Sequence, residues 1–514
     1  MLRPARARPT MWRHSGSDHC QGSLMGGVSL MEGFPSSGAP GIVPGNQSEG
    51  KPPMAGADIA LLSAEEMLDG YGRARFTPVD VLQAVTERVA RLNPALNAFV
   101  AMNPKALAAA GESAMRWRVG RPIGPLDGVP VTVKDLVDLA GFPTRRGSRA
   151  TSPEPVADDA PMVASLRAAG AIVLGKTTTT EFGWKSPGDC PLNGITRNPW
   201  NSVYSTGGSS SGAGAAGAAG FGPLHIGTDA GGSVRIPAAW CGLVGLKPTY
   251  GLIPQWPASA FASVSAAGPM TRTVRDAALM FSVMAQYDRR DPFCSQHEPR
   301  DWRDGIEQGV AGLSVGIVRR LGFDAPADAD AWVGVEAAAA ILAGAGAHVE
   351  EARVDLPDTS QVFSRVWGAA LARLVASTPA QLVGLLDPGI HEVGAALGGM
   401  TAIAFMDAEA MRAEVGHLMG RFHQRYDLLL CPTVPRGPPL ADAATTDPVT
   451  ALTSRWAPWT FAFNLSRQPA ITVPMGARAD GLPNSVQIAA ARFQDALVLR
   501  AARVIERAAP FGQS

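Results

Sequence analysis

The chain has 514 residues, 46% of them hydrophobic, which is enough to bury a sizeable core. Its 45 basic and 45 acidic residues give a formal net charge of zero, so there is no basic field of the kind that collects nucleic-acid phosphates. No apolar run reaches the roughly 18 residues that a membrane helix needs. We therefore expect neither a nucleic acid nor a membrane span.

The cysteines and the N-terminal segment bear on location. Five scattered cysteines show no C-x-x-C pair, which argues against a disulfide framework or a zinc site and suits a reducing cytoplasm. Residues 1–55 are rich in Gly, Ser, Pro and Met and lack hydrophobic periodicity, so we expect a disordered N-terminal tail. Its arginines leave a basic presequence as the alternative, although no apolar segment follows them as in a secretory signal.

The ordered part is expected to begin with two helices. Ser63 and Glu66 have the spacing of a capping box, and Thr77 followed by Pro78 is typical of the start of a second helix. The alternating valines of "DGVPVTVKD" then predict a strand that ends at Lys134. The next segment, "DDAPMVASLRAAGAIVLGK", predicts a helix followed by a buried strand.

The alternation of helices and strands continues downstream. Strand patterns at 313–318, 427–435 and 469–476 are separated by helical patterns. This order predicts an α/β/α sandwich around a largely parallel or mixed sheet. Residues 56–514 show no repeat and no break in composition, so we expect a single domain, in which 290–425 form a mostly helical covering region that shapes the substrate pocket.

A glycine- and serine-rich stretch at 207–235, "GGSSSGAGAAGAAGFGPLHIGTDAGGSVR", matches two known motifs. The first is the dinucleotide-binding G-x-G-x-x-G, which needs an apolar strand directly before it and an acid about 20 residues later. The segment before Gly212 is polar and turn-like, and Asp229 comes too early. This motif therefore does not indicate a nucleotide site.

The second motif is the G-x-S-x-G nucleophile elbow of α/β-hydrolases, centred on Ser210. It also requires an apolar strand before the serine, and a histidine in a suitable turn later in the chain. The nearest candidate, His225, alternates with apolar neighbours in "PLHIG", which is more typical of a core histidine. The elbow is therefore rejected too.

A third interpretation uses both serine-glycine turns. Ser209 and Ser233 are separated by a small-residue segment and a short strand, so the two turns can lie side by side. Successive glycines before Ser233 allow several backbone N–H groups to point one way, as an oxyanion hole requires. A serine nucleophile needs a base, and Lys134 is a candidate if burial keeps it neutral. Pairing of Lys134 with Asp135 at the strand end is the equally weighted alternative.

At these residues the sequence resembles the amidase signature family. The blocks that carry the resemblance are "GPLDGVPVTVKDLVDLAGFPTRRGS", "KTTTTEFGWKSPGDCPLNGITRNPWN", "GGSSSGAGAAGAAGFGPLHIGTDAGGSVRIPAAWCGLVGLKPTYG", "NLSRQPAITVPMG" and "GLPNSVQIAA". They occur in order and cover about residues 60–508. Two departures are Ser211-Gly212 in place of a second glycine pair, and the residues before Gln487, which could reshape a pocket wall.

The resemblance implies a Ser–cis-Ser–Lys triad that cleaves amides without a metal or an organic cofactor. Ser233 would be the nucleophile, Ser209 the bridging residue after a cis peptide bond, and Lys134 the base. The oxyanion hole would be formed by the backbone amides of Ala230, Gly231, Gly232 and Ser233. The acyl group would be contacted by Gly183 and Trp184. The site would be supported by Thr228, Asp229, Arg235 and Ser210.

The substrate and the partners are less defined by the sequence. The apolar composition of 290–425 favours an apolar or aryl amide, anilide or carbamate over a highly charged substrate. One alternative is the glutaminase subunit of a tRNA-dependent amidotransferase, although "LIPQWPASAFASVSAAGPM" looks more like stand-alone amidases. A catalytically silent binding protein of the same fold is the other alternative. A homodimer is left open. A lysine base also predicts activity that rises between about pH 7 and 9.

Overall fold

The structure, a computed structural model, describes residues 58–443 and 447–511. The tail expected at 1–55 lies outside the described residues. The first two helices, α1 (Ala64–Gly72) and α2 (Pro78–Leu96), begin where the sequence predicts. The side chains of Ser63 and Thr77 each accept a hydrogen bond from the backbone amide three residues later, so both predicted caps are confirmed.

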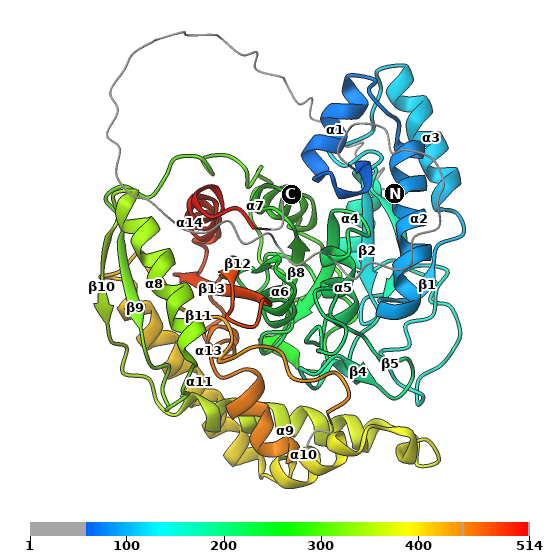
Figure 1. The fold of residues 1–514 in the computed structure, drawn as a ribbon. Coiled ribbons are helices and arrows are strands. Elements are labelled where there is room, and N and C mark those ends of the chain that lie inside the picture. Colours follow the sequence, from blue (N-terminus) through cyan, green and yellow to red (C-terminus); the bar gives the residue numbers. More distant parts are fainter. Residues whose placement is uncertain (1–57, 444–446, 512–514) are drawn as a thin grey trace, which may run out of the picture. The chain divides into compact units, whose positions relative to one another are not determined.

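The centre of the fold is a mixed sheet whose strands, within the described residues, run in the order β1-β3-β2-β6-β8-β7-β12-β13-β11-β9-β10. Figure 1 shows β9 and β10 at one end of this sheet and β1 at the other. The strands β3, β2 and β6 are parallel to one another, as are β11, β9 and β10, and antiparallel pairs join these groups. The bounds are β1 Phe99–Met102, β2 Pro130–Lys134, β3 Ile172–Thr177, β6 Leu224–Asp229, β7 Val244–Lys247, β8 Ala266–Thr271, β9 Ser314–Val318, β10 His348–Ala352, β11 Leu428–Pro432, β12 Ala470–Ala477 and β13 Pro483–Ala490, with a separate pair β4 Asp189–Cys190 and β5 Gly194–Ile195.

Helices cover both faces of the sheet, which confirms the α/β sandwich. Alternate residues of a strand point to opposite faces, and β11 illustrates the result: Leu428 and Leu430 pack in the same cluster as Leu499 of α14, whereas Leu429 packs with Phe363 of α9. The remaining helices are α3 Ala106–Arg118, α4 Pro161–Ala168, α5 Ser211–Ala218, α6 Arg235–Cys241, α7 Val274–Met284, α8 Ala329–Gly344, α9 Thr359–Ser377, α10 Pro388–Gly398, α11 Ala402–Phe422, α12 Pro448–Ala451, α13 Ala462–Leu465 and α14 Asp495–Ala508.

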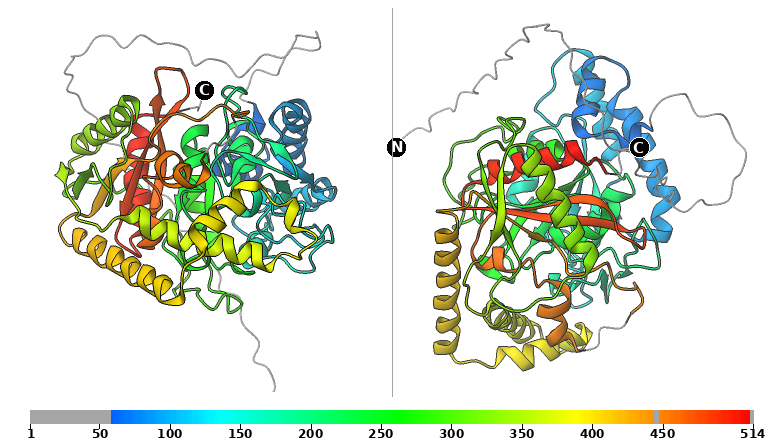
Figure 2. Two further views of the ribbon diagram at one scale, coloured as in Figure 1. Left: turned by 90° about the horizontal axis from the view of Figure 1, so that it is seen from below. Right: turned by 60° about the vertical axis from the view of Figure 1, so that its left-hand side comes forward.

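The segment 290–425 contributes both to the sheet and to its cover. It contains β9 and β10 of the sheet as well as the helices α8 to α11. In both views of Figure 2, α11, drawn in gold, lies well away from the blue helices α1 to α3. Helix α9 brings Phe363 against the turn after β6, where a Cβ atom at Gly231 would lie 2.8 Å from the Phe363 ring.

Among the described residues, no single helix has both the length and the apolar composition needed to cross a membrane. The bent pair α10 and α11 meets that test by length and composition only.

Candidate active site

Segments far apart in the sequence meet where β2 and β6 end. Lys134 is the last residue of β2, which is buried between the parallel strands β3 and β6. The turn after β6 carries Ser233, and the loop before α5 carries Ser209. The amide of Ser210 donates to the carbonyl of Ser233 at 3.2 Å and joins the two serine loops. The structure thus brings the three predicted triad residues into one buried region.

Hydroxyl groups, rather than carboxylates, surround the amine of Lys134. Its Nζ atom lies 2.8 Å from Oγ of Ser209, 2.9 Å from Oγ of Ser210 and 2.9 Å from Oγ1 of Thr228. Burial lowers the pKa of Lys134 well below its usual value, and the charge of Asp229 opposes this without reversing it. A neutral amine keeps a lone pair, so it can accept a proton from one of these hydroxyls while it donates to the others.

The alternative in which Lys134 pairs with Asp135 is wrong. Asp135 forms a buried ion pair with Lys176, with 2.9 Å between Nζ and Oδ1. Consecutive residues of a strand point to opposite faces, so Asp135 lies away from the serine loops. In the described part of the chain, Lys134 forms no ion pair of its own.

The peptide bond between Gly208 and Ser209 is cis, as the family resemblance implies. The carbonyl of Ser209 accepts a hydrogen bond from the amide of Thr180 at 3.3 Å. Gly183 lies beside it, because a Cβ atom there would be 3.1 Å from Oγ of Ser209. With a φ of +81° as well, this position favours glycine on two grounds.

Trp184, predicted with Gly183 to contact the acyl group, has its ring in the core. The side chain is 1% exposed and packs edge-on against Trp456. Its carbonyl accepts a hydrogen bond from Nε1 of Trp367 at 3.2 Å. Of the two predicted contacts, only Gly183 therefore adjoins the serine loops directly, and Trp184 supports the wall behind it.

The turn that carries Ser233 differs in one detail from the predicted oxyanion hole. The amide of Gly232 donates to Oδ1 of Asp229 at 2.8 Å, so it braces the turn and does not face an empty position. Among the described residues, the amides of Ala230, Gly231 and Ser233 have no hydrogen-bond partner. Over the same residues the Ser233 hydroxyl forms no hydrogen bond, and none joins it to Ser209.

The guanidinium group of Arg235 lies behind this turn and is fully buried. It donates twice to the carboxylate of Asp229, through Nε and Nη2, both at 2.9 Å. Its other donors reach the Thr460 carbonyl at 2.9 Å, Oε1 of Gln487 at 2.7 Å and Oδ1 of Asn464 at 2.7 Å. All five N–H donors of the guanidinium are therefore satisfied, which gives the predicted support residues Asp229 and Arg235 a structural basis.

Three members of this network are not among the site residues that the sequence predicts. Gln487, near which a reshaped pocket wall is expected, is fully buried and bonds Arg235. The sequence patterns predict no role for Thr460 or Asn464. Both are polar residues, four positions apart, inside the apolar run "APWTFAFNL", and this spacing places them on one face of a helical turn. That pattern is the signal that could have found them.

Among the described residues, no histidine forms a hydrogen bond with Ser209, Ser210 or Ser233. His225 is fully buried in β6, where Nδ1 is 2.9 Å from Oγ1 of Thr132 and Nε2 is 3.2 Å from the Gly222 carbonyl. Burial and the nearby Arg272 lower its pKa to about 3. The interpretation of His225 as a core histidine is confirmed.

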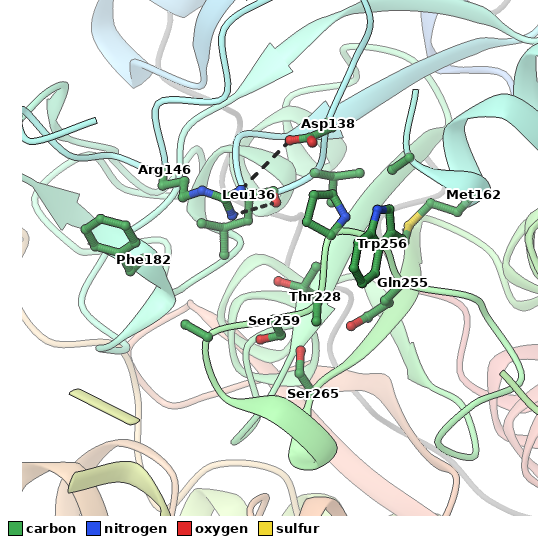
Figure 3. A pocket seen from close by; sticks show the side chains of 15 residues that line it. Leu136, Asp138, Arg146, Met162, Phe182, Thr228, Gln255, Trp256, Ser259 and Ser265 are labelled. Carbon is green, nitrogen blue, oxygen red and sulfur yellow. Dashed lines mark hydrogen bonds and ion pairs between the residues drawn. The ribbon is translucent and has the colours of Figure 1, made fainter. Parts of the chain in front are cut away.

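A cleft lies next to Thr228, the neighbour of Lys134, although Lys134, Ser209 and Ser233 do not line it. Thr228, which bonds Lys134, lines this cleft, and Figure 3 shows Phe182 and Trp256 at opposite sides of it. Arg146 also points into the cleft, where its guanidinium bonds the Leu136 carbonyl at 3.4 Å. The cleft is lined by Leu136, Val137, Asp138, Arg146, Ala160, Met162, Phe182, Thr228, Gln255, Trp256, Pro257, Ala258, Ser259, Ala260 and Ser265. Nine of its fifteen lining residues are apolar, and the six polar ones include one guanidinium and one carboxylate.

Known proteins resemble this chain over most of its length. The family model "Amidase" matches residues 80–499. An acylamidase of Rhodococcus erythropolis is 35% identical over 89% of this chain and 98% of its own length, and a glutamyl-tRNA(Gln) amidotransferase subunit from Symbiobacterium thermophilum is 34% identical over 86% and 96%. A bacterial aryl acylamidase of the amidase signature family superposes with a TM-score of 0.80 at 28% identity, over 88% of this chain and 97% of the other.

A second solved structure, of 6-aminohexanoate cyclic dimer hydrolase with its substrate, also gives a TM-score of 0.80, at 31% identity, over 88% of this chain and 98% of the other. The chain therefore belongs to the amidase signature family and is a hydrolase of carbon–nitrogen bonds in amides.

Proposed function

We propose that this protein hydrolyses a small carboxylic amide through an acyl-enzyme on Ser233, with Lys134 as the base and Ser209 as the bridge between them. The observation that carries the proposal is the position of the Lys134 amine, which is buried without an ionic partner in the described chain and lies 2.8 Å from Oγ of Ser209. A serine hydroxyl becomes an effective nucleophile only when a neighbouring base takes its proton.

The first half of the reaction forms the acyl-enzyme. Lys134 takes the proton of Ser209 while Ser209 takes the proton of Ser233, whose Oγ atom bonds to the amide carbon. The carbonyl oxygen becomes an oxyanion next to the amides of Gly231 and Ser233. A single such donor contributes about 3 kcal/mol of transition-state stabilisation. The C–N bond then breaks, and the leaving nitrogen receives the proton back along the same relay.

The second half releases the acid. Water attacks the ester carbon of acylated Ser233, gives its proton to Lys134 through Ser209, and forms the second tetrahedral oxyanion. Breaking the ester bond returns the proton from Lys134 to Ser233 and leaves the carboxylic acid, which becomes a carboxylate by releasing its own proton to solvent. The amides of Ala230, Gly231 and Ser233 have no hydrogen-bond partner in the described chain, and this supports their assignment to the oxyanion hole. The amide of Gly232 instead stabilises the turn by donating a hydrogen bond to Asp229.

The cleft supports an apolar or aryl amide, anilide or carbamate as the substrate. Rings of Phe182 and Trp256 border it, and Trp256 is 47% exposed although it is apolar. Arg146 and Asp138 lie 4.0 Å apart in the cleft and balance each other's charge. The names of the relatives, an acylamidase and an aryl acylamidase, agree with this choice. A cytoplasmic location and a homodimer stay predictions, to be tested by fractionation and by size-exclusion chromatography.

The direct test combines a panel of acyl anilides, aliphatic amides and carbamates with labelling by a fluorophosphonate. We expect release of the amine from at least one aryl amide, and a covalent adduct that peptide mapping places on Ser233. An adduct on another residue, or turnover that survives Ser233→Ala, contradicts the proposal. Absence of both turnover and labelling would instead favour the catalytically silent binding protein.

A second candidate is the glutaminase component of an amidotransferase, because several relatives at 31 to 34% identity carry that name. A solved structure of that kind superposes less closely, with a TM-score of 0.73. The two functions differ in whether the chain acts alone. Hydrolysis of an anilide by the purified chain supports the amidase. Hydrolysis of glutamine that appears only after a tRNA-binding partner protein is added supports the alternative.

A further inference from the structure

The peptide unit between Gly231 and Gly232 is bonded at both of its polar ends. Its carbonyl oxygen accepts a hydrogen bond from Oγ1 of Thr460 at 2.5 Å. Its N–H group donates to Oδ1 of Asp229 at 2.8 Å. Both amides that flank this unit, those of Gly231 and Ser233, are the proposed oxyanion donors. This peptide unit links the two donors, so holding it in place fixes the spacing between them.

Little besides these two hydrogen bonds would resist rotation of this plane. Reversing it requires changes in ψ of Gly231 and φ of Gly232, and neither residue has a Cβ atom to oppose them. Gly232 has a φ of +126°, in the region that favours glycine. After such a rotation the carbonyl would point where the N–H now points, towards a carboxylate. Such a rotation does not itself turn the neighbouring N–H groups of Gly231 and Ser233. Loss of the two hydrogen bonds would instead free the whole turn to shift, which would change the spacing of those donors while the three triad side chains stayed in place.

Thr460 is well fixed for this role. Its side chain is fully buried, and its hydroxyl also lies 3.1 Å from the Ala457 carbonyl. Its own carbonyl accepts a hydrogen bond from Nη1 of Arg235 at 2.9 Å. A Cβ atom at Gly232 would lie only 2.3 Å from Oγ1 of Thr460, so the hydroxyl is packed directly against the glycine turn. Being buried behind the turn, Thr460 does not contact the substrate.

We infer that Thr460 is a positioning residue for the oxyanion hole, whose hydroxyl holds the Gly231–Gly232 peptide unit in place and so fixes the spacing between the Gly231 and Ser233 amides that catalysis needs. This inference rests on the proposed acyl-enzyme mechanism. It assigns a role to a residue 227 positions after Ser233 in the chain, through a hydrogen bond to the backbone and not through contact with the reacting atoms.

The test is Thr460→Val, which keeps the shape of the side chain and removes its hydroxyl, compared with Thr460→Ser, which keeps the hydroxyl. With an anilide that the wild type hydrolyses, we expect the Thr460→Val substitution to lower kcat by about 10- to 100-fold and to change KM by less than about 3-fold. The kcat of the Thr460→Ser variant should stay within about 3-fold of the wild-type value. Inhibition by a trifluoromethyl ketone, which forms a tetrahedral oxyanion on serine, should weaken in parallel with kcat/KM in the Val variant.

Thr359→Val is the matched control. Thr359 is also fully buried, and its hydroxyl donates to a carbonyl, that of Leu321, at the same 2.5 Å, but at the start of α9. We expect this variant to lose stability without the selective loss of kcat. Equal losses in the two Val variants, a rise in KM without a fall in kcat, or unchanged ketone inhibition in Thr460→Val would overturn the inference.

Further outcomes distinguish the inference from the proposed function. If Thr460→Val does not fold, Thr460→Cys replaces it, because a thiol is only a weak hydrogen-bond donor. An unchanged kcat in the Thr460→Cys variant overturns the inference. If the wild type hydrolyses anilides through Ser233 but all Thr460 variants behave alike, the inference fails and the proposed function stands. If Ser233→Ala retains activity, the proposed function fails whatever Thr460 does.

Discussion

At the scale of single residues, the chemistry depends on the protonation of one amine. Lys134 lies among three hydroxyl groups, within hydrogen-bonding distance of each, and burial lowers its pKa. The charge that would oppose this, on Asp229, is already paired with Arg235. Desolvation therefore outweighs attraction, and the amine can serve as a base at a pH where an exposed lysine cannot.

The first prediction concerns the pH dependence of kcat/KM. Only neutral Lys134 can accept a proton, so activity should rise with pH through the pKa of Lys134 and level off above it. Because that pKa is lowered, the rise should be complete below the usual lysine value of about 10.4. Steady-state kinetics over this range measure it. Lys134→Ala should lose both the activity and the rise, and Lys134→Arg should be inactive because guanidinium keeps its proton.

The second prediction separates the two serines. Ser233→Ala should lower kcat by at least about 1000-fold, since it removes the nucleophile, and should leave the circular dichroism spectrum unchanged. Ser209→Ala should slow acylation strongly but still allow slow labelling of Ser233 by a fluorophosphonate. Stopped-flow measurement of the acylation rate compares them. Equal rates for Ser209→Ala and the wild type would rule out the relay.

Residue by residue, the sequence was informative where function lies within one continuous segment. The glycine-serine stretch and the strand that ends at Lys134 supplied the candidates, the family resemblance implied their roles as a triad, and the cis bond before Ser209 is present. Thr460 and Gln487 were not recognised, because their partners lie across more than 220 positions of chain. A local pattern cannot report a hydrogen bond that only the tertiary fold creates.

At the scale of elements, capping residues and periodicity predicted α1, α2 and β2, but β8 was not predicted. This strand contains Gly268 and Pro269, which usually argue against a central strand. The structure gives the reason for the glycine. A Cβ atom at Gly268 would lie 1.9 Å from the Leu246 carbonyl of the neighbouring β7. The close approach of the two backbones, and not strand propensity, explains why position 268 is a glycine.

The third prediction follows from that contact. Gly268→Ala should lower the melting temperature by several degrees or prevent folding, since the backbone of β7 must move to admit the methyl group. Gly111→Ala in α3 is the control, because a Cβ atom there meets nothing within 4 Å. Alanine also favours a helix over glycine by about 1 kcal/mol. Differential scanning fluorimetry should show the two substitutions shifting the melting temperature in opposite directions.

At the scale of the whole molecule, an ionic cluster joins the loop beside Ser209 to helix α10. Lys185 bonds Asp189 at 2.6 Å and Asp387 at 2.9 Å. The buried carboxyl group of Glu181 accepts a hydrogen bond from the Asp387 amide at 2.6 Å. Burial raises the pKa of Glu181 to about 7. The start of α10 is thus attached to the active-site loop through the Lys185–Asp387 ion pair and the Glu181 carboxyl group.

The fourth prediction gives the sign of that effect. Between pH 4.5, the ordinary value of this carboxyl, and about 7, the folded protein keeps a proton that the unfolded chain has released. The contribution of Glu181 to the free energy of unfolding therefore falls as pH rises through this window, by on the order of 3 kcal/mol in total. Glu181→Gln stays neutral, so urea denaturation should show its stability relative to the wild type increasing from pH 5 to pH 8.

The control for this prediction is Glu87→Gln, on the exposed face of α2. It should leave the pH dependence of the urea midpoint as it is in the wild type. A Glu181→Gln variant whose stability relative to the wild type is the same at pH 5 and pH 8 would show that Glu181 does not titrate in this window.

The five hydrogen bonds of Arg235 also determine how early during translation the active site can form. Two of its partners, Thr460 and Gln487, are added to the growing chain 225 and 252 residues after it. At synthesis rates of about 5–20 residues per second, they emerge from the ribosome roughly 10 to 50 s later than the nucleophile. During that interval the turn around Ser233 lacks the groups that brace it. A nascent chain that already contains all three triad residues is therefore expected to be inactive. It should not hydrolyse amides in its surroundings until translation has passed Gln487.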